Sequence, residues 1–176
     1  IGLPDDDQAS WDKGKSIAEV LYKPLLHKSV PILFSSRVTA EITKYAANTF
    51  LATKVAFINE IADICEATGA DVRLVSKGVG LDDRIGSRFL RAGPGFGGSC
   101  FPKDTEALAA IANQVGSPTM ITEAVIASND QRKRAMGKRI VDALGPKAAD
   151  KSVALLGLTF KPNTDDMRAS PALDLI

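Results

Sequence analysis

The sequence predicts a mainly α-helical fold with one long central helix, flanked by parts of α/β units. From position 37 to about position 68 there is neither Gly nor Pro, and Gly69 then provides a stop signal for a helix. About 32 residues at about 1.5 Å each form a helix of about 48 Å, longer than a small domain is wide. Apolar residues occur around most of the circumference of this helix, so we expect other helices and a second subunit to bury it. The apolar run at residues 152–158 indicates a buried strand that begins an α/β unit.

Helix breakers and apolar spacing predict the shorter elements. Pro24 disturbs a first helical pattern, Gly116 and Pro118 separate two later helices, and Gly145 ends the last one. Residues 78–98 contain seven glycines and one proline, and a connection of this length without regular structure is usually functional. The predicted helices cover residues 13–26, 71–79, 102–115 and 119–144, and residues 31–34 indicate a strand or an extended arm.

Composition limits the classes of protein to consider. The chain has 176 residues, of which 45% are hydrophobic and 24% charged, as in globular proteins. Its 22 Lys and Arg against 21 Asp and Glu give a net charge of +1, so charge offers no argument for a nucleic-acid or membrane partner. No apolar run approaches the roughly 18 residues that cross a bilayer. Two cysteines are too few for a disulfide framework and favour a reducing compartment, the cytoplasm.

Both ends of the sequence predict a piece of a longer polypeptide. No strand pattern precedes Ile1, and residues 171–176 begin a helical pattern that stops while still apolar. Residues 1–7 contain no basic or apolar leader segment. We therefore expect one domain together with parts of its neighbours.

The glycine-rich segment predicts a ligand loop. Gly93, Gly95 and Gly98 match the spacing of a dinucleotide fingerprint, but that motif needs a preceding strand, and residues 88–91 have no strand pattern. We therefore reject the fingerprint. The glycines instead predict a backbone that passes close to a ligand and exposes N–H groups to phosphate.

Cys100 is the candidate nucleophile. It directly precedes a predicted helix, and the partial positive charge of a helix N-terminus favours a thiolate. Asp104 lies one turn further on, where its carboxylate could hold a water or position Lys103. The alternative is that Cys100 is a small buried apolar residue and the glycines only shape a surface loop. Cys65, in the middle of the long helix, is predicted to serve in packing.

Cationic and amide side chains supply candidate anion contacts. Lys44 and Asn48 share a face of the long helix and could donate to an oxyanion, although a solvated surface is the usual place for Lys. Arg84 lies in the glycine-rich segment, and Lys161 and Arg168 follow the predicted strand, where open sheets bind ligands. The alternative for these three is a surface charge paired with a neighbouring Asp.

The histidine count excludes several kinds of site. His27 is the only histidine, and we expect a surface or linker role for it. One His and two Cys cannot form a Ser-His-Asp arrangement or a metal site with His/Cys spacing.

Three segments resemble the UDP-glucose/GDP-mannose dehydrogenase family, and the resemblance covers essentially the whole chain. They are EITKYAANTFLATK at 41–54, GFGGSCFPKD at 95–104, which is the most specific, and GLTFKPNTDDMR at 157–168. The resemblance implies NAD-dependent four-electron oxidation of UDP-glucose to UDP-glucuronate through a cysteine thiohemiacetal and thioester. It also implies a helical dimerisation bundle flanked by remnants of Rossmann-like domains. Residues 1–35 would be the tail of the NAD-binding domain, 36–145 the central dimerisation and catalytic domain, and 146–176 the start of the UDP-binding domain.

The resemblance also implies residue roles. Cys100 would trap the aldehyde, Lys44 and Asn48 would steady the oxyanion, and Asp104 would activate water. Arg84 would reach the substrate of a second subunit, in a homodimer formed through the long helix. Cys100, Lys103 and Arg168 would lie beside NAD. The implied UDP-sugar contacts are Lys44, Asn48, Arg84, Phe89, Leu90, Arg91, Gly93, Gly95, Phe96, Gly97, Phe160 and Lys161.

Two alternatives stay open at the level of sequence. The long apolar helix could make this piece a dimerisation scaffold without a ligand site of its own. The same chemistry could also act on GDP-mannose or on a UDP-N-acetyl-hexosamine. In either case we expect the piece alone not to turn over.

Overall fold

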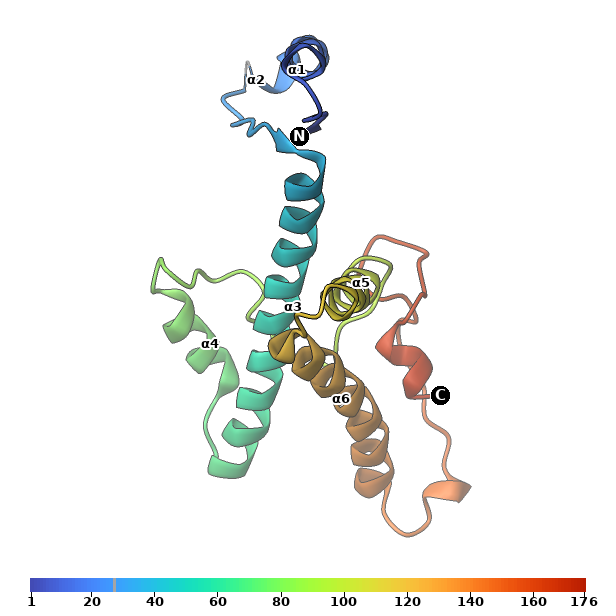
Figure 1. Cartoon of the computed structure of the whole chain (residues 1–176). Coiled ribbons are helices and arrows are strands. Elements are labelled where there is room, and N and C mark those ends of the chain that lie inside the picture. The colour runs from blue at the N-terminus through green and yellow to red at the C-terminus, as the bar shows by residue number, and fades with distance from the viewer. Residues whose placement is uncertain (27) are drawn as a thin grey trace. The chain divides into compact units, whose positions relative to one another are not determined.

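The computed structural model describes residues 1–26 and 28–176, so the expectation for His27 lies outside the described residues. The described chain is mostly helical, as predicted (Figure 1). Two short strands, β1 (Gly2–Leu3) and β2 (Ser35–Ser36), pair in parallel. The α-helices are α1 (Gln8–Leu21), α2 (Lys23–Leu26), α3 (Arg37–Thr68), α4 (Val72–Gly80), α5 (Phe101–Gln114) and α6 (Met120–Leu144), and the 3₁₀ helices are η1 (Ala148–Asp150) and η2 (Pro171–Asp174).

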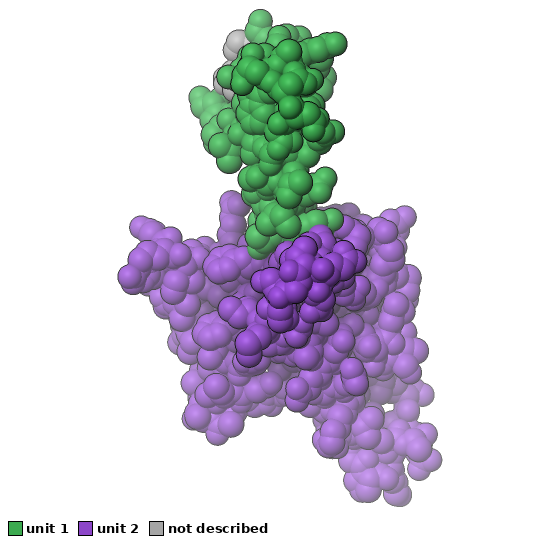
Figure 2. Space-filling view, viewed as in Figure 1, with its two compact units in different colours: residues 1–47 green, residues 48–176 purple. Residues whose placement is uncertain are grey.

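The chain forms two compact units, residues 1–47 and residues 48–176 (Figure 2). In the first unit, Gly2 and Leu3 of β1 lie opposite Ser35 and Ser36 of β2. Asp7 caps α1 by accepting a hydrogen bond from the Ser10 N–H at 2.8 Å, which satisfies a backbone donor of the first turn. This unit contributes the N-terminal part of α3.

The predicted bounds of the long helix are confirmed, because α3 contains no breaker before Gly69, which has a φ of +78°. In the second unit its small residues Ala52 and Ala56 are buried against Phe96 and Val125. Alanine at these positions lets an aromatic ring approach the helix closely. Cys65 is also buried, so the packing role predicted for it is confirmed.

The other helices of the second unit begin and end where the sequence provides signals. Asp71 caps α4 by accepting from the Arg73 N–H at 2.8 Å. Pro102 occupies the first turn of α5, where its missing N–H costs nothing. α6 packs against α5 and ends at Gly145, which has a φ of +76°. The predicted helices at 71–79, 102–115 and 119–144 are therefore confirmed within one or two residues.

The strand predicted at residues 152–158 is wrong. This segment has no regular structure and is exposed, with Leu156 93% accessible. A strand of a parallel sheet needs hydrogen-bonded neighbours and helices that cover its faces. Among the described residues the only sheet joins β1 to β2, so the apolar run lacks the partners that a strand requires.

The segment after residue 158 packs against other parts of the second unit, to which it belongs. Its loop closes with a hydrogen bond from the Phe160 N–H to the Asp166 carbonyl at 3.1 Å. η2 then contacts α6, where Lys133 and Asp174 form an ion pair at 3.2 Å. None of the described helices is both long and apolar enough to cross a membrane.

Candidate functional site

Cys100 is the N-cap residue of α5, and its side chain is exposed. The Ser99 hydroxyl lies 3.8 Å from the Cys100 sulfur. The exposure excludes the alternative of a buried packing cysteine. The sulfur is therefore an accessible thiol at the first turn of a 14-residue helix, as the sequence predicted.

A buried carboxylate lies one turn beyond this sulfur. Asp104 is only 2% exposed, and it accepts a hydrogen bond from the side-chain amide of Asn48 on α3. The ammonium of Lys103 pairs with the other carboxylate oxygen. Burying a carboxylate is costly unless donors surround it, and here an amide and an ammonium serve that purpose. The structure thus joins three predicted site residues, Asn48, Lys103 and Asp104.

Lys44 lies one turn before Asn48 on α3, in the part of the helix that belongs to residues 1–47. The spacing of four residues places the two side chains on one face of that helix, as predicted.

The connection from α4 to α5 has no regular structure, as expected, and aromatic side chains anchor it. Phe96 is buried and meets Phe101 edge-on, with ring centroids 5.7 Å apart. The Phe89 ring also contacts Phe101, with ring centroids 5.8 Å apart. Leu90 is buried, and its carbonyl accepts a hydrogen bond from the Ser76 hydroxyl of α4.

Three polar side chains that were not among the predicted site residues hold the glycine-rich loop. Asn59 of α3 accepts from the Gly93 N–H at 2.8 Å, and Arg132 of α6 donates to the Gly93 carbonyl at 3.0 Å. Asn129 of α6 accepts from the Phe96 N–H at 2.8 Å and donates to its carbonyl at 3.1 Å. The sequence offered one signal for such a residue: Asn59 is a polar residue on a mostly apolar stripe of α3.

Gly97 and Gly98 allow the loop to contact the C-terminal segment of this same chain. A Cβ on Gly97 would lie 2.1 Å from the Ala169 carbonyl oxygen. Gly98 has a φ of +84°, and a Cβ there would lie 2.6 Å from the Phe160 ring. The Gly98 N–H donates to the Arg168 carbonyl at 2.7 Å. The close approach predicted from these glycines is thus made to the chain's own residues 160–169.

Arg168 and Arg84 are each paired with an Asp two residues earlier. Arg168 makes two side-chain bonds to Asp166, at 3.0 and 2.8 Å, and Arg84 binds Asp82 in the same way. These bonds lower the pKa of both carboxyl groups and raise the pKa of both guanidinium groups. The pKa of Arg168 is raised chiefly by its hydrogen bonds to Asp166 and by the charge of that carboxylate. The Lys161 ammonium lies 5.2 Å above the Phe160 ring.

Several of the predicted substrate contacts gather in two places. Phe96, Gly97 and Phe160 gather at the cysteine loop, as described above. Leu90 and Arg91 instead line a pocket of 570 Å³ beside α4, and Cys100 is not part of its lining. This second place contains the hydroxyl groups and guanidinium groups that suit a polar or anionic ligand, supplied by Ser76, Ser87, Arg73 and Arg91.

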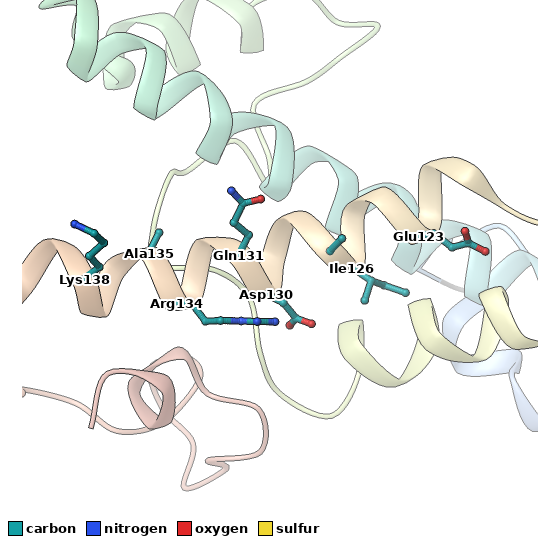
Figure 3. Close-up of a pocket in the computed structure, with 8 residues that line it drawn as sticks. Glu123, Ile126, Asp130, Gln131, Arg134, Ala135 and Lys138 are labelled. Carbon is teal, nitrogen blue, oxygen red and sulfur yellow. The ribbon is translucent and has the colours of Figure 1, made fainter.

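A groove of 720 Å³ runs along α6, and Figure 3 shows its lining. All of its lining residues, including Glu123, Asp130, Arg134 and Lys138, belong to α6. A groove formed by one helix is an open face rather than an enclosed site. Within the part of the chain that the structure describes, no group of His, Cys, Asp or Glu side chains is arranged to hold a metal ion.

Known proteins resemble both the sequence and the fold. The chain is 52% identical over all of its 176 residues to UDP-glucose 6-dehydrogenase of Rhizobium meliloti (strain 1021) and spans 39% of that relative. A UDP-glucose dehydrogenase from the hyperthermophilic archaeon Pyrobaculum islandicum is similar with a TM-score of 0.81 and 35% identity, over 93% of this chain and 37% of the other. The UDP-D-ManNAc dehydrogenase of Pyrococcus horikoshii is similar with a TM-score of 0.74 and 29% identity, over 93% of this chain and 38% of the other.

Family models match the same regions that form the site. Residues 154–176 match the UDP binding domain, and residues 38–131, more than half of the chain, match the central domain. The central match contains all but the first residue of α3, the glycine-rich loop and α5, which together position Asn48, Cys100 and Asp104. The chain belongs to the UDP-glucose/GDP-mannose dehydrogenase family.

Proposed function

We propose that this chain is the central part of an NAD-dependent dehydrogenase that oxidises UDP-glucose to UDP-glucuronate. The observation that carries the proposal is the exposed sulfur of Cys100 one helical turn from buried Asp104, which is bonded to Asn48. The relatives named as UDP-glucose dehydrogenases support the choice of substrate. The chain spans about 39% of such a relative, so the reaction needs residues from outside it.

The proposed chemistry uses Cys100 as a covalent catalyst. The C6 alcohol of the sugar is first oxidised to an aldehyde, and the Cys100 sulfur adds to the aldehyde carbon to form a thiohemiacetal. Loss of hydride from that carbon gives a thioester, and water then displaces the sulfur to release the carboxylate. NAD supplies the hydride acceptor for both oxidations. The balance is one alcohol and one water converted to one carboxylate, with two hydrides transferred to two NAD and three protons released.

Asp104 and Asn48 have complementary roles in this scheme. The side-chain amide of Asn48 donates to Asp104, which fixes its position. In the proposed scheme the amide of Asn48 and the ammonium of Lys44 donate to the oxyanion that develops on the sugar carbon. The carboxylate of Asp104 orients the amide and accepts a proton from the attacking water.

Cationic groups near the sulfur suit the diphosphate of a dinucleotide. The side chains of Lys103 and Arg168 are 67% and 72% exposed, although each is also paired with an Asp. We propose that both lie beside NAD. The UDP-sugar is proposed to contact residues 89–97 together with Phe160 and Lys161, while Arg84 reaches the substrate of a second subunit.

The proposed domain organisation follows the family. Residues 1–35 are the tail of a Rossmann-like NAD-binding domain, 36–145 the dimerisation and catalytic domain, and 146–176 the beginning of the UDP-binding domain. Both cysteines are free thiols, which supports a reducing compartment such as the cytoplasm.

A homodimer through α3 is supported by an exposed apolar stripe. Phe50, Phe57 and Ile64 are 65%, 48% and 58% exposed, and a spacing of seven residues places them on one helical face. Phe57→Glu in the full-length protein should shift sedimentation from dimer to monomer. Ile121→Glu changes an exposed apolar residue of α6 and should leave the dimer intact. A Phe57→Glu protein that stays dimeric would contradict this interface.

The test of the proposed activity compares the two cysteines in the full-length enzyme. Cys100→Ser should lower NADH formation with UDP-glucose by about 10³-fold or more, because the covalent route is lost. Cys65→Ser should retain activity, since that sulfur is buried in packing. Normal turnover by Cys100→Ser would refute the mechanism. GDP-mannose and UDP-N-acetylmannosamine, offered in parallel, test the alternative substrates, and the isolated 176-residue chain is expected to be inactive.

A further inference from the structure

The backbone between Gly93 and Phe96 has no regular structure, so its N–H and C=O groups need partners outside a helix or sheet. Asn129 supplies two of them. Its side chain accepts from the Phe96 N–H at 2.8 Å and donates to the Phe96 carbonyl at 3.1 Å. The side-chain amide of Asn129 therefore pairs with both the N–H and the C=O of Phe96, as the backbone of a neighbouring strand does in a sheet.

Asn129 is only 5% exposed, and its surroundings fix it in place. Val125, one turn earlier on α6, belongs to the same buried cluster as the Phe96 ring. Gly95, with a φ of +121°, brings the loop so close that a Cβ there would lie 3.0 Å from the Asn129 Oδ1 and 2.8 Å from the Lys133 Cγ. α6 thus holds both the ring and the backbone of Phe96.

Side chains of α3 and α6 together bind the other end of the loop, at Gly93. Gly93 donates to Asn59 and accepts from Arg132, and Arg132 also donates to the Asn59 carbonyl at 3.4 Å. Both ends of this four-residue segment are therefore fixed by side chains of the two long helices. Cys100 lies beyond it, at the N-cap of α5, and Asp104 anchors that helix separately to α3.

We propose that Asn129 is a positioning residue, which fixes the substrate-binding loop through the Phe96 backbone. The inference rests on the proposed function, because it assigns the loop to the sugar nucleotide. Since α5 and not Asn129 holds the sulfur, a loosened loop should weaken substrate binding more than it slows the chemical steps.

The test uses Asn129→Ala and Asn129→Asp in the full-length enzyme. Asn129→Ala removes both bonds, and Asn129→Asp keeps the size and the acceptor but loses the donor. Ser128→Ala is the matched control, because the Ser128 hydroxyl joins α6 to Glu60 of α3 at 2.9 Å without touching the loop. Each protein is measured for kcat and KM with UDP-glucose and for hydrogen exchange of the amides in residues 93–98.

Asn129→Ala should raise KM about tenfold with kcat changed less than about threefold, and it should speed exchange in residues 93–98 about tenfold. Asn129→Asp, whose carboxylate would face the Phe96 carbonyl without a donor, should give a change of the same kind, and Ser128→Ala should change neither KM nor exchange. A loss of thermal stability in Asn129→Ala with unchanged KM and exchange would mean a purely structural role and overturn the proposal. If Asn129→Ala does not fold, an unchanged KM and exchange in Asn129→Asp overturns it equally.

The two hypotheses fail in different ways. A wild-type enzyme that does not oxidise UDP-glucose would refute the proposed function, while exchange in residues 93–98 of the ligand-free protein still tests the positioning by Asn129. A wild-type enzyme that oxidises UDP-glucose, with variants that match it in KM and exchange, would refute the positioning alone.

Discussion

The contact between Gly98 and Phe160 allows a double-mutant test of how the loop is held. In Gly98→Ala the new Cβ would lie 2.6–2.8 Å from three atoms of the Phe160 ring, at a backbone φ of +84°. A left-handed backbone costs a non-glycine residue about 1–2 kcal/mol, and overpacking costs about 1–3 kcal/mol. Gly98→Ala should therefore destabilise the protein by about 2–5 kcal/mol.

Removing the Phe160 ring should relieve the overpacking but not the cost of the left-handed backbone. In a Phe160→Ala background, Gly98→Ala should cost about 1–2 kcal/mol, so the coupling energy should be about 1–3 kcal/mol. Gly97→Ala is the matched control, because its Cβ would meet the backbone of Ala169 at 2.1 Å, which Phe160→Ala does not move. Urea unfolding of the single and double variants measures each free energy. Additive Gly98 and Phe160 effects, or relief of Gly97→Ala by Phe160→Ala, would refute this account of the packing.

Three further predictions test other parts of the second unit. Ile58→Ala should destabilise by about 2–5 kcal/mol in urea unfolding, because Ile58 is completely buried on α3, and a loss below about 1 kcal/mol would contradict that packing. Ellman's reagent should modify Cys100 in the native protein but Cys65 only after unfolding, and two thiols that react together would contradict the burial of Cys65. Arg168 lowers the pKa of Asp166. The pair therefore stabilises the folded protein above about pH 4, and this stabilisation is lost as the pH falls through the lowered pKa. The urea midpoints of wild type and Asp166→Asn should therefore differ at about pH 6 and approach each other as the pH falls through the lowered pKa, and a difference that persists in acid below that pKa would exclude this pair as its source.

Signals that are local in sequence predicted local structure well. The bounds of α3 follow from a run without Gly or Pro that ends at Gly69, and Pro102 marks the first turn of α5. The place of Cys100 just ahead of that helix, and of Asp104 one turn later, depends only on helical geometry. These features need no knowledge of distant contacts.

Features that depend on distant segments were missed or were wrong. Asn129 meets Phe96 across 33 residues of sequence, and neither position alone indicates the pair. The apolar run at residues 152–158 has the composition of a buried strand, but strand formation depends on neighbours, and the described residues provide none. The apolar composition of a segment shows that it can be buried, but it does not show whether a neighbouring strand is present to pair with it.

The glycines ahead of Cys100 illustrate how one motif can serve both packing and chemistry. The proposed chemistry requires only that the sulfur be accessible and that donors be close. Gly95, Gly97 and Gly98 are each required by a contact inside the chain, with α6, with the Ala169 backbone and with the Phe160 ring. A side chain at any of the three would displace a segment that approaches the loop. The glycine-rich run is therefore explained by packing around the cysteine loop without any bound phosphate, and substitutions there should alter stability even in the ligand-free protein.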